Sequence, residues 1–360
     1  MTNSSACNLL VFNLRTDADD PILGFTTEWI NALAAYYTRV DVLTMHAGRI
    51  AVAPNVRVFS AGREKGYSEP RRLLVFYSTL ARLLRATRYT ACFAHMQPLF
   101  AALAAPLLRA RGVPVTLWYA HSSVTLRLRL AERLVNRVVT PSPESFRLPS
   151  RKLTVTGHGV DTDRFTPAPA PRPPDAPFIV VSVGRLSPVK RVEVLIAAAH
   201  LLHARGLGFR LRLVGDAPPQ HAAYAADLRA QAADLGGAVE FAGPVAHAQV
   251  ADAYRAADVM VTASATGSVD KAVLEAMACG LPVVASGEPY RAMLAQWSNA
   301  LLFPEGDAAA LADRLSALAQ TPPDQRRALG LALREIVARE HSLSRLTQRL
   351  AEEILPCASS

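Results

Sequence analysis

The sequence predicts an α/β protein with two doubly wound, parallel-sheet domains that face each other across a cleft. Three observations predict this class. Short runs rich in β-branched and other apolar residues alternate with longer runs of helical period. The alternation stops at a proline-rich stretch, residues 166–177, and starts again after it. The chain has 360 residues, of which 51% are hydrophobic, and this is enough to bury two cores of ordinary size.

The first domain is expected to span residues 1–165. Its strand–helix–strand order predicts a parallel sheet with helices on both faces, because parallel neighbours need a crossover connection. Its first apolar run has no basic leader and is too short for a membrane span, so it is expected to be a buried strand. The expected strands are 9–14, 40–45, 91–96, 114–121 and 136–142, and the expected helices are 26–37, 71–88 and 101–111.

The stretch T-P-A-P-A-P-R-P-P-D-A-P, residues 166–177, is expected to be a stiff linker. Neither a helix nor a central strand tolerates this much proline. The second domain is expected to span residues 178–340, and residues 341–360 are expected to form a C-terminal helix that packs back on the first domain. The expected strands of the second domain begin at residues 178, 210, 238, 259, 281 and 300.

Charge is distributed unevenly along the chain. The formal net charge is +9, and residues 1–165 hold 21 Lys and Arg against 11 Asp and Glu, so the first domain carries the whole positive excess. Such an excess attracts acidic partners, such as a phosphorylated acceptor or an anionic lipid surface. A generally arginine-rich proteome would explain it equally well.

The four cysteines, at positions 7, 92, 279 and 357, have neither the spacing of a metal site nor the density of a secreted scaffold. We therefore expect reduced thiols and no zinc site. Together with the lack of a predicted membrane span, this favours a soluble, cytoplasmic protein.

One segment of the second domain combines a polar entry, a helix and a sharp exit: G-S-V-D-K-A-V-L-E-A-M-A-C-G-L-P-V-V, residues 267–284. Ser268 or Asp270 can cap the start of a helix, Gly280 can take the left-handed position beyond its end, and Pro282 prevents continuation. A helix start that follows a strand and a glycine loop offers unpaired amide hydrogens to a phosphate or a sugar oxygen.

Four loops follow expected strands of the second domain, at 184–191, 215–217, 243–245 and 264–271. Ligands of doubly wound sheets bind beyond the carboxyl ends of the strands, so these loops are the expected site.

In the first of these loops, Gly184 precedes Arg185 and Lys190, which are suited to a diphosphate, although both could instead be solvated surface cations. Asp216 and Glu275 are the acidic residues expected near the site, where a carboxylate can accept ribose hydroxyls. Glu275 could equally be an exposed helix residue.

The second half contains, in this order, the motifs V-G-R-L-x-x-x-K-R, L-V-G-D, F-A-G-P-V and V-L-E-A-M-A-C-G-L-P-V-V-A-S. In this order they resemble the donor domain of a GT-B-fold, family-4-type retaining glycosyltransferase. In the first half, D-P-I-L-G-F-T, W-Y-A-H and G-H-G-V-D-T-D-R-F resemble the family's acceptor-side loop, histidine strand and interdomain turn. The match covers nearly the whole chain and implies two Rossmann-like domains.

The resemblance implies roles by position. Arg185 and Lys190 would hold the diphosphate of a nucleotide sugar and neutralise it as it leaves, and His121 would lie beside the transferred sugar. As an isolated histidine, His121 would more often be structural, and His95 and His158 are weaker candidates. The implied donor-binding residues are Gly24, Gly184, Gly215, Asp216, Pro244, Val245, Gly267, Ser268, Asp270, Lys271 and Glu275, with Glu275 at the ribose, Pro244 and Val245 at the base and Gly24 near the phosphates.

The sequence departs from the family at Gly267, where a glutamate usually contacts the donor sugar; Asp270 or Lys271 could substitute for it. No metal is expected, because cations and a helix start can stabilise the departing diphosphate. Two D-x-D patterns, Asp17 with Asp19 and Asp161 with Asp163, lie in turns and are not expected to bind metal. Retention of anomeric configuration is implied by the resemblance alone.

The expected helix at 71–88 is amphipathic, with arginines along one side and apolar residues along the other. It could lie on the inner face of an anionic membrane, which would make a lipid-linked acceptor accessible, or it could simply pack on the first sheet. Nucleic acid is not expected, because aromatics do not interleave with the arginines. The arginines are Arg71, Arg72, Arg82 and Arg85, and the apolar residues are Leu73, Phe76, Leu80, Leu83 and Leu84.

Two other classes of function stay open on the sequence. A nucleotide-dependent oxidoreductase would share the fold, but neither domain has the G-x-G-x-x-G turn followed by an acid. A non-catalytic nucleotide-sugar-binding protein would share the cleft, and only turnover separates it from an enzyme.

Overall fold

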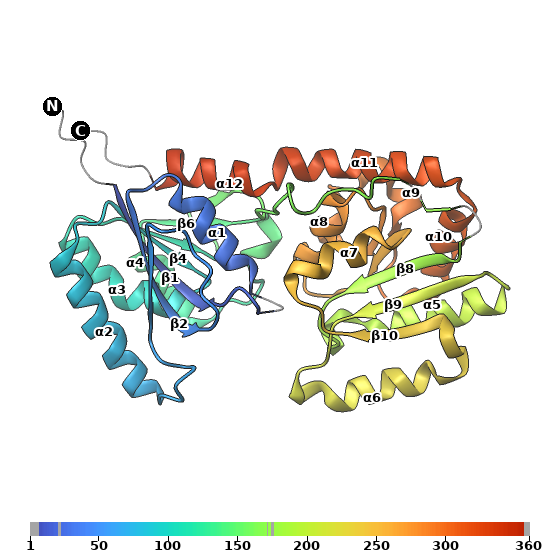
Figure 1. Cartoon of the computed structure of the whole chain (residues 1–360), viewed down its shortest axis with the longest axis horizontal. Coiled ribbons are helices and arrows are strands. Elements are labelled where there is room, and N and C mark those ends of the chain that lie inside the picture. The colour runs from blue at the N-terminus through green and yellow to red at the C-terminus, as the bar shows by residue number, and fades with distance from the viewer. Residues whose placement is uncertain (1–6, 21–22, 171, 174–175, 356–360) are drawn as a thin grey trace. The chain divides into compact units, whose positions relative to one another are not determined.

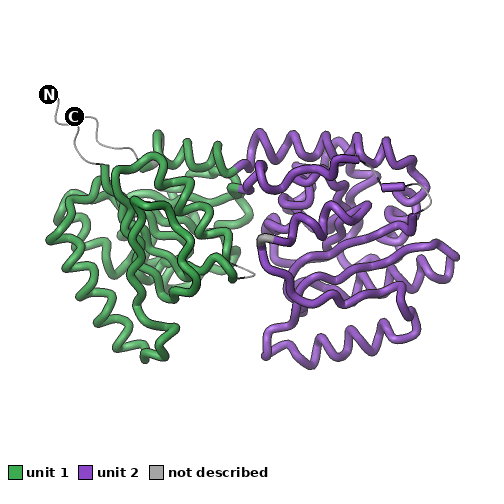
Figure 2. The backbone as a smooth tube through the Cα atoms, viewed as in Figure 1, with its two compact units in different colours: residues 1–159, 343–360 green, residues 160–342 purple. Residues whose placement is uncertain are grey.

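The computed structural model describes residues 7–20, 23–170, 172–173 and 176–355. The chain divides into two compact units (Figure 2): unit 1 comprises residues 1–159 and 343–360, and unit 2 comprises residues 160–342. Each unit contains one parallel sheet with helices packed against it (Figure 1). The predicted class, an α/β protein with two doubly wound sheets, is confirmed.

Unit 1 is built on a sheet of seven parallel strands in the order β3-β2-β1-β4-β5-β6-β7. Two of these strands, β3 and β7, were not predicted. The strands are β1 (Asn8–Thr16), β2 (Arg39–Ala47), β3 (Val56–Ser60), β4 (Ala91–His95), β5 (Val115–Trp118), β6 (Arg137–Thr140) and β7 (Leu153–Val155), and the helices are α1 (Phe25–Ala34), α2 (Glu69–Ala86), α3 (Pro98–Ala110), α4 (Leu126–Leu134) and α12 (Leu343–Arg349).

Alternation along β1 divides the core of unit 1 between the two faces of the sheet. Leu10 and Phe12 belong to a buried cluster with residues of α2, α3 and α4. Leu9 and Val11 belong to a second buried cluster with residues of α1 and α12. Successive side chains of a strand point to opposite faces, so one continuous apolar run fills both clusters.

Unit 2 is built on six parallel strands in the order β10-β9-β8-β11-β12-β13. Helices α5 and α6 lie on one side of this sheet, and α7 and α8 lie on the other (Figure 1). The strands are β8 (Phe178–Val183), β9 (Phe209–Val214), β10 (Val239–Gly243), β11 (Val259–Thr262), β12 (Val283–Ser286) and β13 (Leu302–Phe303), and the helices are α5 (Val192–Ala204), α6 (Ala222–Gln231), α7 (Val250–Arg255), α8 (Lys271–Ala278), α9 (Ser298–Leu301), α10 (Ala308–Gln320) and α11 (Pro323–Glu340).

Short helical turns complete the connections in both units. They are Pro143–Ser145, Pro188–Lys190, Pro219–His221, Ala233–Ala238, His247–Gln249, Glu288–Tyr290 and Ala295–Trp297, with a final π-turn at Leu350–Ile354.

The strand order of unit 2 reverses at β8. The chain passes from β8 to β9 on one side and later returns to place β11 on the other side. The loops that leave β8 and β11 therefore diverge from neighbouring strand ends, which is where doubly wound sheets bind ligands.

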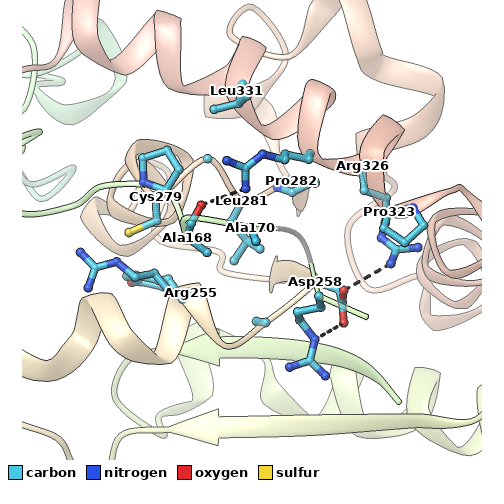
Figure 3. Close-up of a pocket in the computed structure, with 16 residues that line it drawn as sticks. Ala168, Ala170, Arg255, Asp258, Cys279, Leu281, Pro282, Pro323, Arg326 and Leu331 are labelled. Carbon is cyan, nitrogen blue, oxygen red and sulfur yellow. Dashed lines mark hydrogen bonds and ion pairs between the residues drawn. The ribbon is translucent and has the colours of Figure 1, made fainter. Parts of the chain in front are cut away.

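The proline-rich stretch is not the division between the units. The division falls between Gly159 and Val160, and residues 166–177 belong to unit 2. Their described part is fastened there by arginines: Arg172 donates to the Asp258 carboxylate at 3.1 Å, Arg255 to the Thr166 carbonyl at 3.0 Å, and Arg327 to the Ala168 carbonyl at 2.9 Å. The three arginines, together with Ala168 and Asp258, are among the residues that line a pocket of about 60 Å³ between the stretch and α11 (Figure 3).

The carboxyl-terminal segment returns to unit 1, to which residues 343–360 belong. Helix α12 packs on α1, and Leu346 and Leu350 are buried in the cluster that also holds Trp29. The Tyr37 hydroxyl donates to the Leu355 carbonyl at 2.8 Å, which holds the end of the described chain.

The cysteines differ from the expectation of four reduced thiols. Cys7 is disulfide-bonded, so the expectation is wrong for this residue. Cys92 and Cys279 are free thiols, and both are buried. Cys357 lies outside the described residues.

No helix among the described residues combines the length and the apolar character that a membrane span requires.

Candidate functional site

The loops after β8 and β11 meet at the point where the strand order of unit 2 reverses. The Ala265 amide donates to the Val189 carbonyl at 2.8 Å, which joins the two loops directly. Arg191, the last residue before α5, has a left-handed backbone with φ 48°. Such a conformation in a residue other than glycine costs energy, and residues held in it cluster at active sites and ligand-binding loops.

Lys190 and Asp270 form an ion pair at this junction. The Lys190 ammonium lies 2.8 Å from Asp270 Oδ1, and the exposed fractions of the two side chains are 19% and 12%. Asp270 stands immediately before α8, yet its side chain makes no capping hydrogen bond to the helix. The predicted capping role of the Asp270 side chain is therefore wrong, because the carboxylate turns toward Lys190 instead.

Arg185 follows Gly184 in the same loop, and its side chain is exposed. Within the described part of the chain it makes no ion pair or hydrogen bond. Its predicted role beside Lys190 stays a prediction, because an exposed guanidinium fits either a ligand contact or a solvated surface. Ser187, between the two cations, is buried, and its hydroxyl has no hydrogen-bond partner among the described residues.

Two glycines bring neighbouring strand ends close together. A Cβ added to Gly215 would lie 2.0 Å from the Gly184 carbonyl oxygen, and both residues have φ values that side chains disfavour, 135° and 151°. The Gly215 amide donates to the Gly243 carbonyl at 2.8 Å. These contacts hold the carboxyl-terminal ends of β8, β9 and β10 next to one another.

Glu275 is buried on α8, with 5% of its surface exposed, so the alternative of an exposed helix residue is wrong. Its Oε1 lies 3.2 Å from His247 Nε2 and 3.9 Å from the Lys271 ammonium, one helical turn away. Tyr254 is fully buried nearby, and its pKa is raised well above the usual value by burial and by the charge of Glu275. Burial of a charged group costs free energy unless the group is paired, and His247 and Lys271 are the polar groups beside Glu275 Oε1.

The remaining donor-side candidates lie on loops of the same unit. Asp216 is exposed and its carboxylate accepts from the Ala217 amide at 2.8 Å, so it stabilises its own turn. Pro244 is exposed after β10, and Val245 is half-buried against the core of unit 2. Gly267 has φ 69°, a left-handed conformation that favours glycine, and Ser268 next to it is half-buried.

Two candidates lie in unit 1. His121 is exposed in the loop after β5, and its Nδ1 accepts from the Ser123 amide at 3.0 Å. Gly24 is buried immediately before α1, with a right-handed φ of −54°. His95 is buried against Trp29 and Trp118, which fits a structural histidine.

Aspartates of both D-x-D patterns accept hydrogen bonds from other protein groups. Asp19 receives two hydrogen bonds from Arg49, each 2.7 Å long, which lower its pKa. Asp161 accepts from the amides of Asp163 and Arg164 and so stabilises its own turn. In the part of the chain that the structure describes, no three potential ligands gather into a metal site.

Sequence reasoning missed His247 and Arg164, which complete the surroundings of Glu275. Arg164 Nη1 lies 3.2 Å from His247 Nδ1. The available signal was a histidine two residues after the P-V of the F-A-G-P-V motif, at a strand exit.

Two family descriptions match the chain, each over one part of it. Residues 25–164 match Glycosyltransferase Family 4, and residues 177–321 match Glycosyl transferases group 1. Together the two matches cover most of the chain, and their order agrees with the order of the two sheets. The chain belongs to the family-4-type glycosyltransferases with the GT-B fold, as its motifs predicted. This family assignment removes the oxidoreductase alternative.

Similar proteins include one glycosyltransferase named for a pathway and one named for a substrate. WcaL of Escherichia coli (strain K12), named for colanic acid biosynthesis, is 32% identical over 212 residues, which are 56% of this chain and 51% of the relative. D-inositol 3-phosphate glycosyltransferase 2 of Catenulispora acidiphila is 39% identical over 177 residues, 43% of this chain and 40% of the relative. The chain thus spans about half the length of these relatives, or less.

Solved structures share the fold over nearly the whole chain. Anabaena HepE, in complex with UDP and glucose, has a TM-score of 0.76 and 19% identity, and the match covers 97% of this chain and 99% of that one. Sucrose-phosphate synthase of Thermosynechococcus elongatus has a TM-score of 0.74 and 22% identity, with 96% and 97% covered.

Proposed function

We propose that this chain transfers a sugar from a nucleotide diphosphate sugar to an acceptor hydroxyl, with retention of anomeric configuration and without a metal ion. One observation carries the proposal: the loop after β8 brings the Lys190 ammonium to the start of α8, at the reversal point of the sheet. A cation and a helix start together suit a diphosphate. The UDP bound by Anabaena HepE, which has the same fold, supports a nucleotide as the ligand.

The diphosphate is the part of the donor that these groups would stabilise. As the glycosidic bond breaks, negative charge grows on the departing diphosphate while the sugar becomes oxocarbenium-like. Lys190, Arg185 and the first amides of α8 would stabilise this charge, which is the role that a metal ion takes elsewhere. The buried hydroxyl of Ser187 supports a polar ligand at this loop, because an unpaired buried hydroxyl costs about 1–3 kcal/mol.

The nucleoside and the sugar would be bound by the neighbouring loops. Glu275 would accept the ribose hydroxyls, and the backbone at Pro244 and Val245 would contact the base. The left-handed backbone at Gly267 supports a role for main-chain groups, in place of a glutamate, near the sugar. His121 would lie beside the transferred sugar, as in the family that the chain belongs to.

The acceptor is proposed to be lipid-linked or phosphorylated, with peripheral contact to an anionic membrane through α2. Leu74 is 72% exposed on this helix, and Arg71, Arg82 and Arg85 are exposed on it as well. A helix that exposes leucine among arginines suits an anionic lipid surface.

The apolar side of α2 departs from the prediction at two positions. Leu73, expected on the buried side, is 38% exposed, and the side chain of Arg72, expected outside, is only 16% exposed. The other expected apolar residues, Phe76, Leu80, Leu83 and Leu84, are buried.

Release of free nucleotide tests the proposal. The full chain would be incubated with UDP- and GDP-sugars, with lipid-linked and phosphorylated acceptors, in buffer with and without EDTA. We expect nucleotide release that depends on the acceptor and resists EDTA, with the product anomer matching the donor in NMR spectra. Binding of a nucleotide sugar without turnover would favour a non-catalytic binding protein, and inversion would exclude the proposed mechanism.

A further inference from the structure

The side chains of Arg164, His247 and Glu275 form a continuous row that starts near the beginning of unit 2. Those of His247 and Glu275 are buried, and Arg164 is half-buried. Arg164 Nη1 lies 3.2 Å from His247 Nδ1, and His247 Nε2 lies 3.2 Å from Glu275 Oε1. The side chains of His247 and Glu275 are 8% and 7% exposed. Arg164 belongs to the motif G-H-G-V-D-T-D-R-F, to which the proposed function assigns no role.

The row fixes the position of the proton on the His247 ring. A guanidinium can only donate hydrogen bonds, so Nδ1 must accept from Arg164. The neutral ring then carries its proton on Nε2 and donates it to the Glu275 carboxylate.

The orientation of the ring is fixed as well. Arg164 also donates, through Nη2, to the carbonyl oxygen of His247. The ring packs edge-on against Phe165, which is 1% exposed, with 5.8 Å between the centroids. Two consecutive residues, Arg164 and Phe165, therefore hold both the main chain and the ring of His247.

The two polar contacts made by His247 and Lys271 fall on the same oxygen of Glu275, Oε1. A carboxylate held through one oxygen presents the other in a fixed direction. Without such a hold, the carboxylate could turn, and part of the binding energy would be used to order it.

We propose that His247 is a positioning residue: it anchors Glu275 Oε1 so that Oε2 is presented to the ribose hydroxyls of the nucleotide, and Arg164 selects the tautomer that allows this. The inference rests on the proposed function, because it requires a nucleotide whose ribose meets Glu275. It gives Arg164 and Phe165, the last two residues of the motif G-H-G-V-D-T-D-R-F, the role of holding His247 in place. In this proposal the ring of His247 acts through Glu275 and not through contact with the nucleotide.

A comparison of UDP with 2′,3′-dideoxy-UDP isolates the ribose contact. Affinities for both would be measured by calorimetry on the full chain, for wild type, His247→Phe and His247→Gln. Phenylalanine keeps a ring against Phe165 but cannot donate, whereas glutamine can donate from an amide nitrogen near the place of Nε2.

We expect wild type to prefer UDP over the dideoxy analogue, His247→Phe to bind UDP about tenfold more weakly with the analogue unaffected, and His247→Gln to recover most of the loss. A His247→Phe variant that keeps the wild-type preference, or that loses both ligands equally, would overturn the inference and leave the proposed function intact. A wild type that binds UDP but does not distinguish it from the analogue would overturn the ribose role of Glu275, and a wild type that binds no nucleotide would overturn the proposed function. Each of these two wild-type results would also contradict the role proposed for His247.

A second measurement determines the tautomer in the wild type itself and uses a variant only to assign the signal. A long-range ¹H–¹⁵N spectrum of wild type labelled at histidine reports the tautomer of each ring, and the His247→Gln spectrum identifies the signal of His247. We expect the Nε2–H tautomer. A proton on Nδ1 would contradict the inference.

Discussion

The Lys190 ammonium lies 2.8 Å from Asp270 Oδ1, so the cation expected to bind a diphosphate is held by a carboxylate of the same site. The pair joins the loop after β8 to the residue before α8. It keeps Lys190 at the helix start in the absence of a ligand, but it also places a negative charge where a diphosphate would bind.

Asp270→Asn is therefore expected to strengthen nucleotide binding. The substitution keeps the size of the side chain and removes its charge, which leaves Lys190 paired with a neutral amide. At a partly exposed site, the removal of one like charge is expected to raise the affinity for UDP about three- to tenfold at low salt. Calorimetry at two salt concentrations checks this, with a smaller gain expected at the higher concentration. Weaker binding would mean that the orientation of Lys190 by Asp270 matters more than the charge of Asp270.

Gly215→Ala is expected to destabilise the fold. The added methyl group would lie 2.0 Å from the Gly184 carbonyl oxygen, and the backbone at φ 135° disfavours any side chain. We expect a loss of about 2–4 kcal/mol in the free energy of unfolding, measured by denaturant titration. Gly237→Ala is the matched control, because an added Cβ there meets no atom within 4 Å. Equal stabilities of the two variants would contradict the close approach of these strand exits.

Cys279 gives a pH-dependent prediction. Burial raises the pKa of its thiol to about 12, so the folded protein holds this proton more tightly than the unfolded chain, where a thiol titrates near 8.5. The thiol's contribution to stability is complete below about pH 8.5 and is lost as the pH rises toward 12.

A comparison of wild type with Cys279→Ala isolates this contribution. The difference between their unfolding free energies is expected to fall by about 1.4 kcal/mol per pH unit between roughly pH 9 and 10. At pH 8 the thiol is expected to resist alkylation until the protein unfolds. Rapid labelling of the native protein would contradict the burial of Cys279 beside the proline-rich stretch.

Helix α2 can be tested against vesicles. Arg85→Glu combined with Leu74→Ser reverses one charge and removes one apolar contact, and each basic residue near an anionic surface contributes about 1 kcal/mol. We expect the variant to bind phosphatidylglycerol vesicles at least tenfold more weakly than wild type in a flotation assay. The control Arg210→Glu changes an exposed arginine of unit 2. Equal binding of all three proteins would exclude α2 as the membrane contact.

The alternating pattern predicted the class of fold and most strands, because buried parallel strands leave dense apolar runs between helices. Two strands were missed for physical reasons. β3 (V-R-V-F-S) and β7 (L-T-V) are the outermost strands of their sheet, so they are less buried and carry a weaker apolar signal.

The contacts within the candidate site could not be predicted from the sequence for a different reason: they join residues that are far apart in the chain. Sequence order could place Lys190, Asp270 and Glu275 on loops and a helix start, but it could not show that Asp270 pairs with Lys190. Nor could it show the contact between Arg164 and His247, which are 83 residues apart in the sequence. Proline content likewise predicted a linker at 166–177, whereas the arginine contacts that hold this stretch to unit 2 arise only from the tertiary fold.

The most direct test of the central claim is the affinity for UDP of wild type, Lys190→Ala and Arg210→Ala, measured by calorimetry. Arg210 is an exposed cation at the opposite, amino-terminal end of β9 and controls for the loss of one positive charge. We expect Lys190→Ala to bind UDP about 10- to 100-fold more weakly, and Arg210→Ala to bind it as wild type does. Equal affinities for wild type and Lys190→Ala would contradict the assignment of Lys190 to the diphosphate.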